Sequence, residues 1–337
     1  MWRLTIVLAI CIHCVFSDLQ ITPIAGPQVN LPDSVFWSDY DQSLYYADYF
    51  AFGNESSIYR YDYNKGTIHS AYVDGKDEML YLLPVKRCGD ILQSILESIL
   101  YKNNLFMAGF GHDNYLIHWD GYQPIAKVIR SAFSVEENSP SAKMDISKPN
   151  AKGEFFGGTT TDQYCGGTSN SSVYSYSIAK GLRKIYTGSQ ANSGMVFNGD
   201  TIYVTDVCLQ TITELKKDRV GNYVSRVVFD FRTEDNATRP SGLEIDADGY
   251  LYVVGYVNGK VWRIDPKTST GVVIATFPYF LTGVAFGGPK RDILFVVTAS
   301  ALIQAWPLKA LYYNPAPPLI MITGLETRGV RSEDLQC

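Results

Sequence analysis

The chain alternates short runs of apolar and aromatic residues with turns rich in glycine, aspartate and asparagine. Each unit consists of a turn, a short apolar strand, a second turn and another strand. The clearest copy covers residues 248–255 and leads to a second strand at 260–266. The same pattern occurs at residues 41–62, 104–121, 152–176, 199–215 and 292–306, where 302–306 is the second strand of the last copy.

The units have similar lengths. Spacings of 61, 50, 47, 49 and 43 residues separate six equivalent positions: Leu44, Leu105, Phe155, Ile202, Leu251 and Leu294. This is the length of a four-stranded blade, and six copies match a closed propeller. We therefore predict an all-β fold, a six-bladed β-propeller with four-stranded antiparallel blades around a central channel. A pair of β-sandwiches, the competing architecture, would not produce six units of similar length.

The N-terminus has the pattern of a secretory signal peptide. Arg3 supplies a positive charge, residues 4–16 are almost wholly apolar, and Ser17 suits a cleavage site. A short membrane anchor is the alternative, but the apolar run is too short to span a bilayer. We expect residues 1–17 to be removed and residues 18–337 to form a single propeller domain. The expected location is secreted and extracellular, with no membrane partner.

Cysteines and glycosylation motifs are consistent with export. An oxidising compartment permits up to two disulfides among the four cysteines that remain after cleavage, and three pairings stay open. These cysteines are Cys88, Cys165, Cys208 and Cys337. Three Asn-x-Ser/Thr sequons predict a glycoprotein with glycans at Asn54, Asn170 and Asn236.

Charge excludes some partners. The chain has 29 basic and 34 acidic residues, and loss of Arg3 with the signal leaves a net charge near −6. No Lys/Arg cluster is present, so we expect neither nucleic acid nor an anionic membrane as a partner. We expect a monomer. The 24 tyrosines suit β-strands and do not by themselves indicate a function.

Several phrases along the repeats resemble one family. Residues 282–289 followed by 292–298, and the segment 240–255, resemble blade motifs of the SMP-30/gluconolactonase/luciferin-regenerating-enzyme (regucalcin-like) family. Residues 116–121 and 322–325 fit its insect members, and the similarity runs from about residue 31 to 330. The chain thus resembles a secreted, divergent member. The resemblance implies a divalent cation at the top of the channel, held by Glu, Asn and Asp, and an Asp that acts as base in lactone hydrolysis.

The chain departs from that family pattern at the site. Asp33 stands at the glutamate position, Ser193 at the asparagine position and Ser241 at the position of the aspartate base. Lys143 and Asp145 stand where the family's substrate loop has Arg and Asn. A serine hydroxyl is a poor ligand for a hard cation and cannot act as a base near pH 7. We therefore expect no catalytic residue and at most a weakly bound divalent cation, calcium or zinc, unless Asp145 compensates.

Three functions remain open. The favoured one is a pseudoenzyme that binds a small molecule in the central channel, such as a pigment or another aromatic metabolite. The alternative is a divergent metal-dependent lactonase or esterase that uses Asp33 and Asp145, and the third is an extracellular protein-interaction scaffold. For a binding protein we expect four apolar side chains near the pocket mouth: Phe36, Met144, Met195 and Phe197.

Overall fold

The computed structural model describes most of the chain after the predicted signal peptide. The described residues are 19–48, 57–76, 79–87, 104–135, 142–161, 165, 171–177, 179–303, 311–313, 315–331 and 335–336. The predicted signal peptide, Asn54, Asn170, Cys88 and Cys337 lie outside them. Within these residues, no helix combines the length and apolar character needed to span a bilayer.

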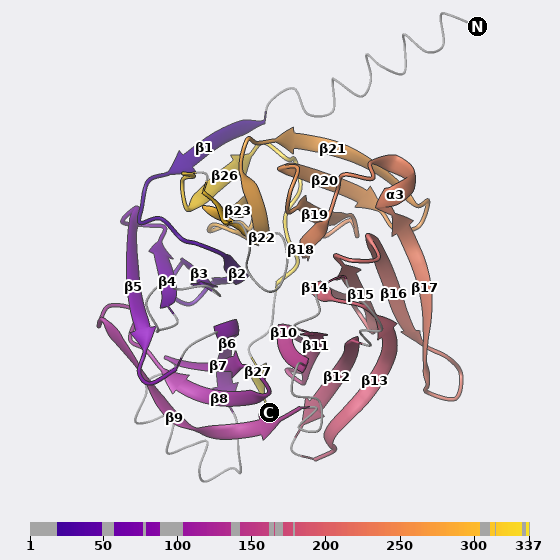
Figure 1. The fold of residues 1–337 in the computed structure, drawn as a ribbon, viewed down its shortest axis with the longest axis horizontal. Helices are drawn as coiled ribbons and strands as arrows, with labels where there is room; N and C mark the ends of the chain where they lie inside the picture. Colours follow the sequence, from indigo (N-terminus) through magenta and orange to yellow (C-terminus); the bar gives the residue numbers. More distant parts are fainter. Residues whose placement is uncertain are drawn as a thin grey trace, which may run out of the picture.

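Antiparallel sheets surround a common axis and give an all-β, propeller-like fold (Figure 1). Three sheets each consist of four consecutive strands. In the first they are β10 (Ala142–Pro149), β11 (Phe155–Thr161), β12 (Ser171–Ser177) and β13 (Gly181–Ser189). In the second they are β14 (Asn192–Asn198), β15 (Thr201–Asp206), β16 (Thr211–Lys217) and β17 (Tyr223–Asp230). In the third they are β18 (Pro240–Ile245), β19 (Leu251–Gly255), β20 (Lys260–Asp265) and β21 (Thr270–Thr276).

A fourth four-stranded sheet joins the two ends of the chain. Its order is β1 (Gln20–Ile24), β26 (Leu319–Thr323), β23 (Ile293–Ala299) and β22 (Phe280–Gly287). β1 pairs antiparallel with β26 over five residue pairs, from Gln20↔Thr323 to Ile24↔Leu319. The first described strand therefore completes the sheet that the last repeat begins, and this pairing closes the circle.

Nine further strands form one sheet rather than two separate blades. Its order is β2 (Pro32–Ser38), β3 (Ser43–Asp48), β4 (Ser57–Asp62), β5 (Thr67–Val73), β9 (Ile125–Ser134), β8 (Asp113–His118), β7 (Leu105–Phe110), β6 (Met79–Arg87) and β27 (Leu335–Gln336). The outer strands β5 and β9 join it through two parallel pairs, Tyr72↔Ile125 and Val73↔Ala126. The described residues thus confirm the all-β, propeller-like fold, with four separate four-stranded sheets, one larger curled sheet and one two-stranded sheet.

The repeat correctly places a strand at each of the six equivalent positions. In the structure each of these strands is the second strand counted from the axis. The six equivalent positions fall one each in β3, β7, β11, β15, β19 and β23, and all six side chains are buried. A second strand has neighbours on both edges and packed sheets on both faces. Its apolar character is therefore almost continuous, which makes it the strongest sequence signal in each unit.

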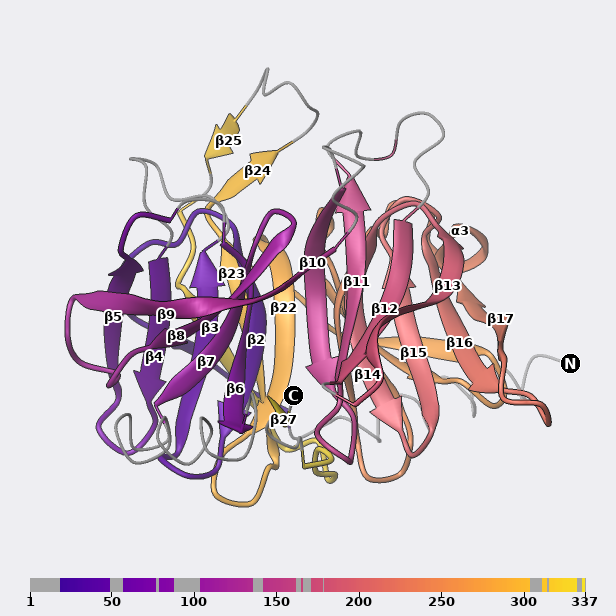
Figure 2. The same cartoon turned by 90° about the horizontal axis from the view of Figure 1, so that it is seen from below.

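The prediction is wrong at the end of the last repeat. We expected residues 302–306 to form the strand after β23, but Ala301–Ile303 forms β24, which pairs with β25 (Leu311–Tyr313) in a separate hairpin. Figure 2 shows this hairpin beyond the ends of the sheets. β26 takes the expected place instead, because its residues Leu319, Ile320 and Ile322 supply buried side chains next to β23.

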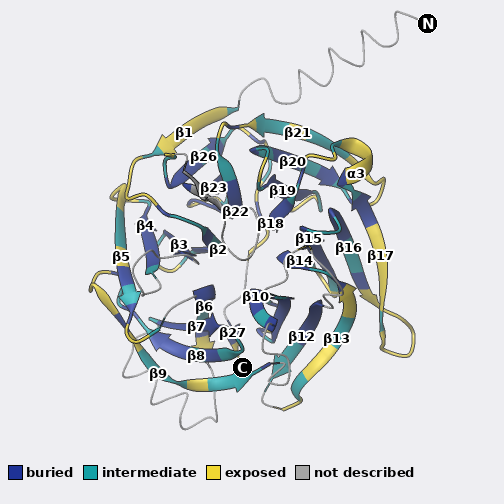
Figure 3. Ribbon diagram, viewed as in Figure 1, coloured by how far each residue is buried: buried dark blue, intermediate teal, exposed yellow. Residues whose placement is uncertain are grey.

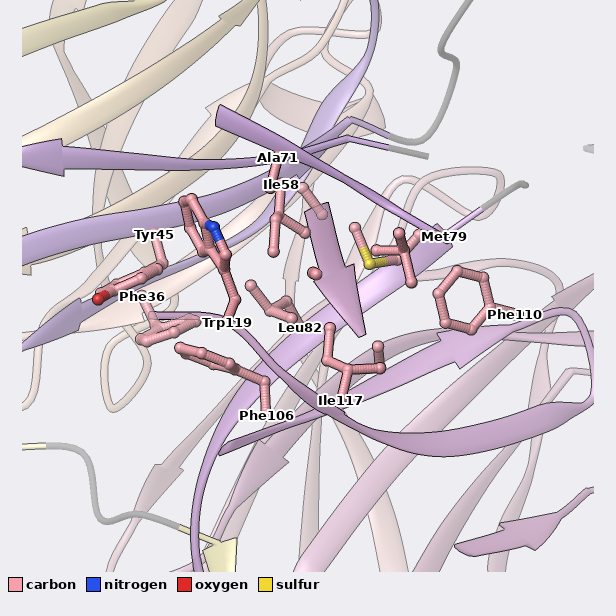
Figure 4. Close-up of a cluster of buried hydrophobic side chains, with 14 residues drawn as sticks. Phe36, Tyr45, Ile58, Ala71, Met79, Leu82, Phe106, Phe110, Ile117 and Trp119 are labelled. Atoms are coloured by element: carbon pink, nitrogen blue, oxygen red, sulfur yellow. The ribbon is translucent and has the colours of Figure 1, made fainter. Parts of the chain in front are cut away.

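Apolar side chains fill the spaces between neighbouring sheets. Burial is greatest on the inner strands, and exposed residues gather on the outer strands (Figure 3). Between β2–β5 and β6–β9 the rings of Phe36 and Tyr45 stack at 5.2 Å, and Trp119 meets Tyr45 edge-on at 6.1 Å (Figure 4). Aromatic pairs of this kind stabilise a core beyond the area they bury. Packing between sheets therefore fixes how closely the inner strands approach the axis.

A disulfide joins two neighbouring sheets. Cys165 follows β11, Cys208 follows β15, and their Cα atoms are 4.9 Å apart. This selects one of the three predicted pairings and leaves Cys88 and Cys337 as the remaining pair of cysteines. Of the three sequons, only Asn236 lies in the described residues; it is exposed in the turn after α3 (Phe231–Glu234).

Removal of the closing strand tests the role of β1. Deletion of residues 18–25 should lower the free energy of unfolding by about 2–5 kcal/mol, because five paired residues lose their backbone hydrogen bonds. Denaturant titration followed by tryptophan fluorescence would measure the change. The control Gln20→Ser/Thr22→Ser alters exposed side chains but keeps the backbone, and should leave stability almost unchanged. Equal stability of the deletion variant would contradict this role.

Candidate functional site

A small cavity lies on the axis, where the innermost strands converge. It has room of about 40 Å³ for the centres of water-sized molecules, enough for about three waters or a few non-hydrogen atoms. Each innermost strand, β2, β6, β10, β14, β18 and β22, contributes to the wall (Figure 1). The lining residues are Asp33, Ser34, Val35, Phe36, Leu82, Leu83, Ile146, Ser147, Lys148, Ser193, Gly194, Met195, Gly242, Leu243, Gly283 and Val284.

Every innermost strand carries a register shift in its first half. The shifts lie between Asp33 and Phe36, Met79 and Tyr81, Met144 and Ile146, Asn192 and Gly194, Pro240 and Leu243, and Leu281 and Gly283. A β-bulge turns a side chain away from its regular direction, and bulges are common beside functional sites. Asp145, Ser193 and Ser241 fall within three of these bulges, and Asp33 borders a fourth.

A hydroxyl residue followed by glycine recurs in three of the bulges. The pairs are Ser193-Gly194, Ser241-Gly242 and Thr282-Gly283. A Cβ atom on Gly194 would lie 2.8 Å from Leu243 N, and one on Gly242 would lie 2.7 Å from Gly283 Cα. The glycines are therefore required because neighbouring inner strands approach too closely for any side chain.

The hydroxyl groups join these neighbouring strands. Ser193 Oγ donates to Pro240 O at 2.8 Å, which links β14 to β18, and Ser241 Oγ donates to Thr282 O at 2.8 Å, which links β18 to β22. Ser193 Oγ also lies 3.1 Å from Thr205 Oγ1. Both serines are buried. Their hydroxyls are thus used in bonds between sheets.

Ser34 makes the same kind of link from β2 to β6. Its Oγ donates to Leu82 O at 3.1 Å and accepts from Leu82 N at 2.9 Å. The backbone of Ser34 has φ 55°, which directs its hydroxyl toward β6 within the bulge. Sequence reasoning missed this residue, although it directly follows Asp33.

Two carboxyl groups lie together at the bulges. Asp145 is only 8% exposed, and its carboxyl has no hydrogen-bond partner among the described residues. Burial raises the pKa of Asp145 to about 7, although Lys143 opposes the shift. Burial also raises the pKa of Asp33 well above its usual value; the charge of Asp145 adds to this shift, and Ser34 N, which donates to Asp33 Oδ1 at 2.6 Å, opposes it. The pair therefore favours a proton or another positive charge nearby.

An ion pair joins two inner strands that are not adjacent, three residues further along these strands. Lys148 Nζ in β10 donates to Glu244 Oε2 in β18 at 3.1 Å, and β14 lies between these two strands. Glu244 Oε1 also accepts from Ile245 N at 3.2 Å. Lys148 lines the cavity, but its charge is already matched by Glu244.

The structure brings the predicted site residues to one level of the fold. Asp33 and Ser193 line the cavity, whereas Lys143, Asp145 and Ser241 do not. Asp145 and Ser241 directly precede the lining residues Ile146 and Gly242. Among the described residues no group of three or more His, Cys, Asp or Glu side chains could hold a metal ion.

Of the four apolar side chains that we expected near the pocket mouth, two line the cavity and two do not. Phe36 and Met195 line the cavity, but Met144 and Phe197 do not. Met144 packs between sheets with Tyr81 and Phe155, because it precedes the bulge and faces away from the axis. The ring of Phe197 meets Phe156 at 5.1 Å, further along β14.

Substitution of Asp145 tests the buried carboxyl. Between about pH 4 and pH 7 the folded chain binds more protons than the unfolded chain, so the free energy of unfolding should fall as pH rises through this range. Asp145→Asn removes the charge that Asp33 and Lys143 face. We expect a flatter pH profile and a gain of the order of 1–3 kcal/mol at pH 8. Denaturant titrations from pH 4 to pH 8 would measure this, and an unchanged profile would contradict it.

Substitution of Ser34 tests the links between inner strands. Ser34→Ala leaves Leu82 N–H without its acceptor and should cost about 1–3 kcal/mol of unfolding free energy. Ser38→Ala is the matched control, because Ser38 ends the same strand and its hydroxyl makes no hydrogen bond among the described residues. Thermal and denaturant unfolding would compare the two variants, and equal stability would show that the Ser34 link contributes nothing.

Comparison with known proteins places this geometry in context. The family model described as the SMP-30/gluconolactonase/LRE-like region matches residues 31–300. Regucalcin of Xenopus laevis is 21% identical over 322 residues, covering 93% of this chain and 97% of that protein. The putative sugar lactone lactonase YvrE of Bacillus subtilis is 25% identical over 192 residues, covering 56% and 64%.

Solved structures agree with the fold. A luciferin-regenerating enzyme superposes with a TM-score of 0.78 at 18% identity, covering 95% of this chain and all of that one. A regucalcin of Agrobacterium tumefaciens, described as a calcium-binding protein, gives a TM-score of 0.69 at 17% identity, covering 94% and 96%. At these identities the structures establish a shared fold and leave the chemistry to the residues of the site.

Proposed function

Because the chain belongs to the SMP-30/gluconolactonase/LRE-like family, we propose that it binds a small molecule in its central cavity without hydrolysing it. One observation carries this proposal. Ser193 and Ser241, at the expected ligand and base positions, both donate their hydroxyls to backbone carbonyls of neighbouring strands. A neutral hydroxyl used in this way neither binds a hard cation well nor removes a proton from water.

The proposal includes a six-bladed count for the propeller. In this interpretation the nine-stranded sheet is two blades, β2–β5 and β6–β9, that share a short parallel contact at their outer edges. Its support is that β2 and β6 each contribute separately to the cavity wall, as do the innermost strands of the four other sheets.

A divalent cation would be held weakly at most. Asp33 and Asp145 supply two carboxylates, whereas calcium takes six to eight oxygen ligands. The serines that stand at the other ligand positions are already hydrogen-bonded. Calcium or zinc binding therefore requires water for most of its coordination, in a cavity with room for about three water molecules.

The size of the cavity also limits the ligand. A space of about 40 Å³ is far smaller than the 300–1,000 Å³ of an ordinary drug-sized pocket. A pigment or other aromatic metabolite would place only one substituent there. A compact ligand fits the proposal better.

The proposed setting is extracellular, as a monomeric, secreted glycoprotein. The Cys165–Cys208 disulfide suits an oxidising compartment. Asn236 is exposed and accessible to a glycan. The net charge of −5 over the full sequence does not favour nucleic acid as a partner.

A second candidate function rests on Asp145. A carboxyl with a pKa of about 7 suits a general base at neutral pH, so a divergent metal-dependent lactonase or esterase is the alternative. No observation on the described surface favours the protein-interaction scaffold in the same way.

A hydrolysis assay separates binding from catalysis. With sugar lactones and added calcium, zinc or manganese, the wild-type chain should show no turnover above background. The variant Ser193→Asn/Ser241→Asp, which restores both expected ligand types, should bind these cations at least tenfold more tightly, because it regains a carboxylate and an amide oxygen. Isothermal titration calorimetry would measure the affinity.

The matched control for that experiment is Ser193→Ala/Ser241→Ala, which breaks the same hydrogen bonds without adding a ligand. It should bind cations no better than the wild-type chain. Robust wild-type turnover that a chelator abolishes and that Asp33→Ala removes would overturn the binding proposal and establish the lactonase.

A further inference from the structure

We infer that Asn198 is a site of spontaneous deamidation, a covalent change that does not depend on any ligand in the cavity. The sequence contains two Asn-Gly pairs, Asn198-Gly199 and Asn258-Gly259. Asparagine is thermolabile, and a glycine after it leaves the backbone nitrogen unhindered because glycine has no Cβ atom. The dipeptide alone therefore predicts similar reactivity at both positions, and only the surrounding structure separates them.

The reaction needs no reactant other than water. The backbone nitrogen of the glycine attacks the side-chain carbonyl carbon, Cγ, of the asparagine, and the Cγ–Nδ2 bond breaks. The proton of the glycine nitrogen leaves with Nδ2 as ammonia, and a five-membered succinimide ring remains. Water then opens one of the two carbonyl C–N bonds of this ring and gives aspartate or isoaspartate. The glycine nitrogen must therefore be free to approach Cγ, and the side-chain amide must be free to turn.

Both conditions hold at Asn198. This residue ends β14, and Gly199 and Asp200 form the tight turn to β15; all three are exposed. Among the described residues, neither the side-chain amide of Asn198 nor the N–H of Gly199 donates a hydrogen bond. No atom lies within 4 Å of the position that a Cβ on Gly199 would take. Gly199 N can therefore approach Asn198 Cγ without the loss of a hydrogen bond that either group makes.

The same two groups are held by hydrogen bonds in the second pair. Asn258 Nδ2 donates to Asp235 Oδ2 at 3.1 Å and to Thr238 Oγ1 at 2.8 Å. Gly259 N, the nitrogen that would attack, donates to Gly255 O at 3.1 Å. The leaving group and the nucleophile of this pair are therefore both engaged elsewhere.

Packing restricts the second pair further. A Cβ on Gly259 would lie 2.0 Å from Phe277 O, and one on Gly255 would lie 2.1 Å from Asn258 Oδ1. Gly259 O also accepts from Phe277 N at 2.8 Å. Attack on Asn258 thus requires a local opening that breaks several hydrogen bonds at once, and such openings are rare in well-packed regions.

The product at Asn198 carries a negative charge close to other acidic residues. Asp200 is two residues further along, and Asn198 Nδ2 is 3.5 Å from the position of a Cβ on Gly249, which follows Asp248. Like charges repel, so either product should weaken this turn. Isoaspartate also adds a methylene to the backbone where Asn198 pairs with Thr201. The β14–β15 turn is therefore the place where the folded chain ages.

Incubation of the folded chain at pH 8, followed by tryptic peptide mapping with tandem mass spectrometry, tests the inference. We expect deamidation at Asn198 to be at least tenfold faster than at Asn258, because the second site must open before it reacts. In concentrated urea the two rates should become similar, since neither site keeps its contacts. Asp235→Ala removes one acceptor of Asn258 and should accelerate its deamidation severalfold, while Asn198 in the same chain is the unchanged control.

Three results would overturn the inference. The first is an equal or faster reaction at Asn258 in the folded chain. The second is no reaction at Asn198 in the folded chain although both sites react in urea. The third is an unchanged rate at Asn258 in folded Asp235→Ala, which would remove the structural explanation; near-UV circular dichroism verifies that this variant is folded. None of these results bears on ligand binding or hydrolysis, which the lactone assay tests separately.

Discussion

Closure of the circle of sheets is the constraint on which the remaining structure depends. β1 and β26, from opposite ends of the chain, pair within one sheet and hold the first and last repeats together. A closed circle leaves fewer exposed sheet edges, which matters for a chain so rich in β-forming residues. Closure also brings the innermost strand of each group of four close to one common axis. The separation of those strands is then set by packing between sheets.

Convergence at the axis explains the character of the site. Where Gly194 and Gly242 meet neighbouring backbone, no Cβ atom fits, and the bulges beside them direct Ser193 and Ser241 toward the next strand. Positions that resemble a family's ligand set thus serve as connections between sheets. Asp145 makes no such connection among the described residues, and it is buried beside the cavity without lining it. The same crowded level of the fold therefore contributes to stability through its hydroxyls.

The sequence predicts the parts of this structure that repeat. Leu251 and its five counterparts mark second strands correctly because those strands are apolar on both faces. Short segments that resemble family motifs located the residues of the candidate site. The Ser-Gly and Thr-Gly pairs are the sequence signal that could have located the bulges. β1 could not be predicted, since its side chains are mostly exposed and only its pairing matters. The Lys148–Glu244 pair joins residues 96 positions apart, and local patterns carry no information on such contacts.

The β1–β26 pairing has a consequence for how the protein is made. Gln20 emerges early during synthesis, and its partner Thr323 is about three hundred residues later. β1 must therefore remain without this partner until β26 has been synthesised. Contacts this distant in sequence are slow to form. Closure of the circle is thus a late step, and a product interrupted before β26 would carry an open, association-prone edge.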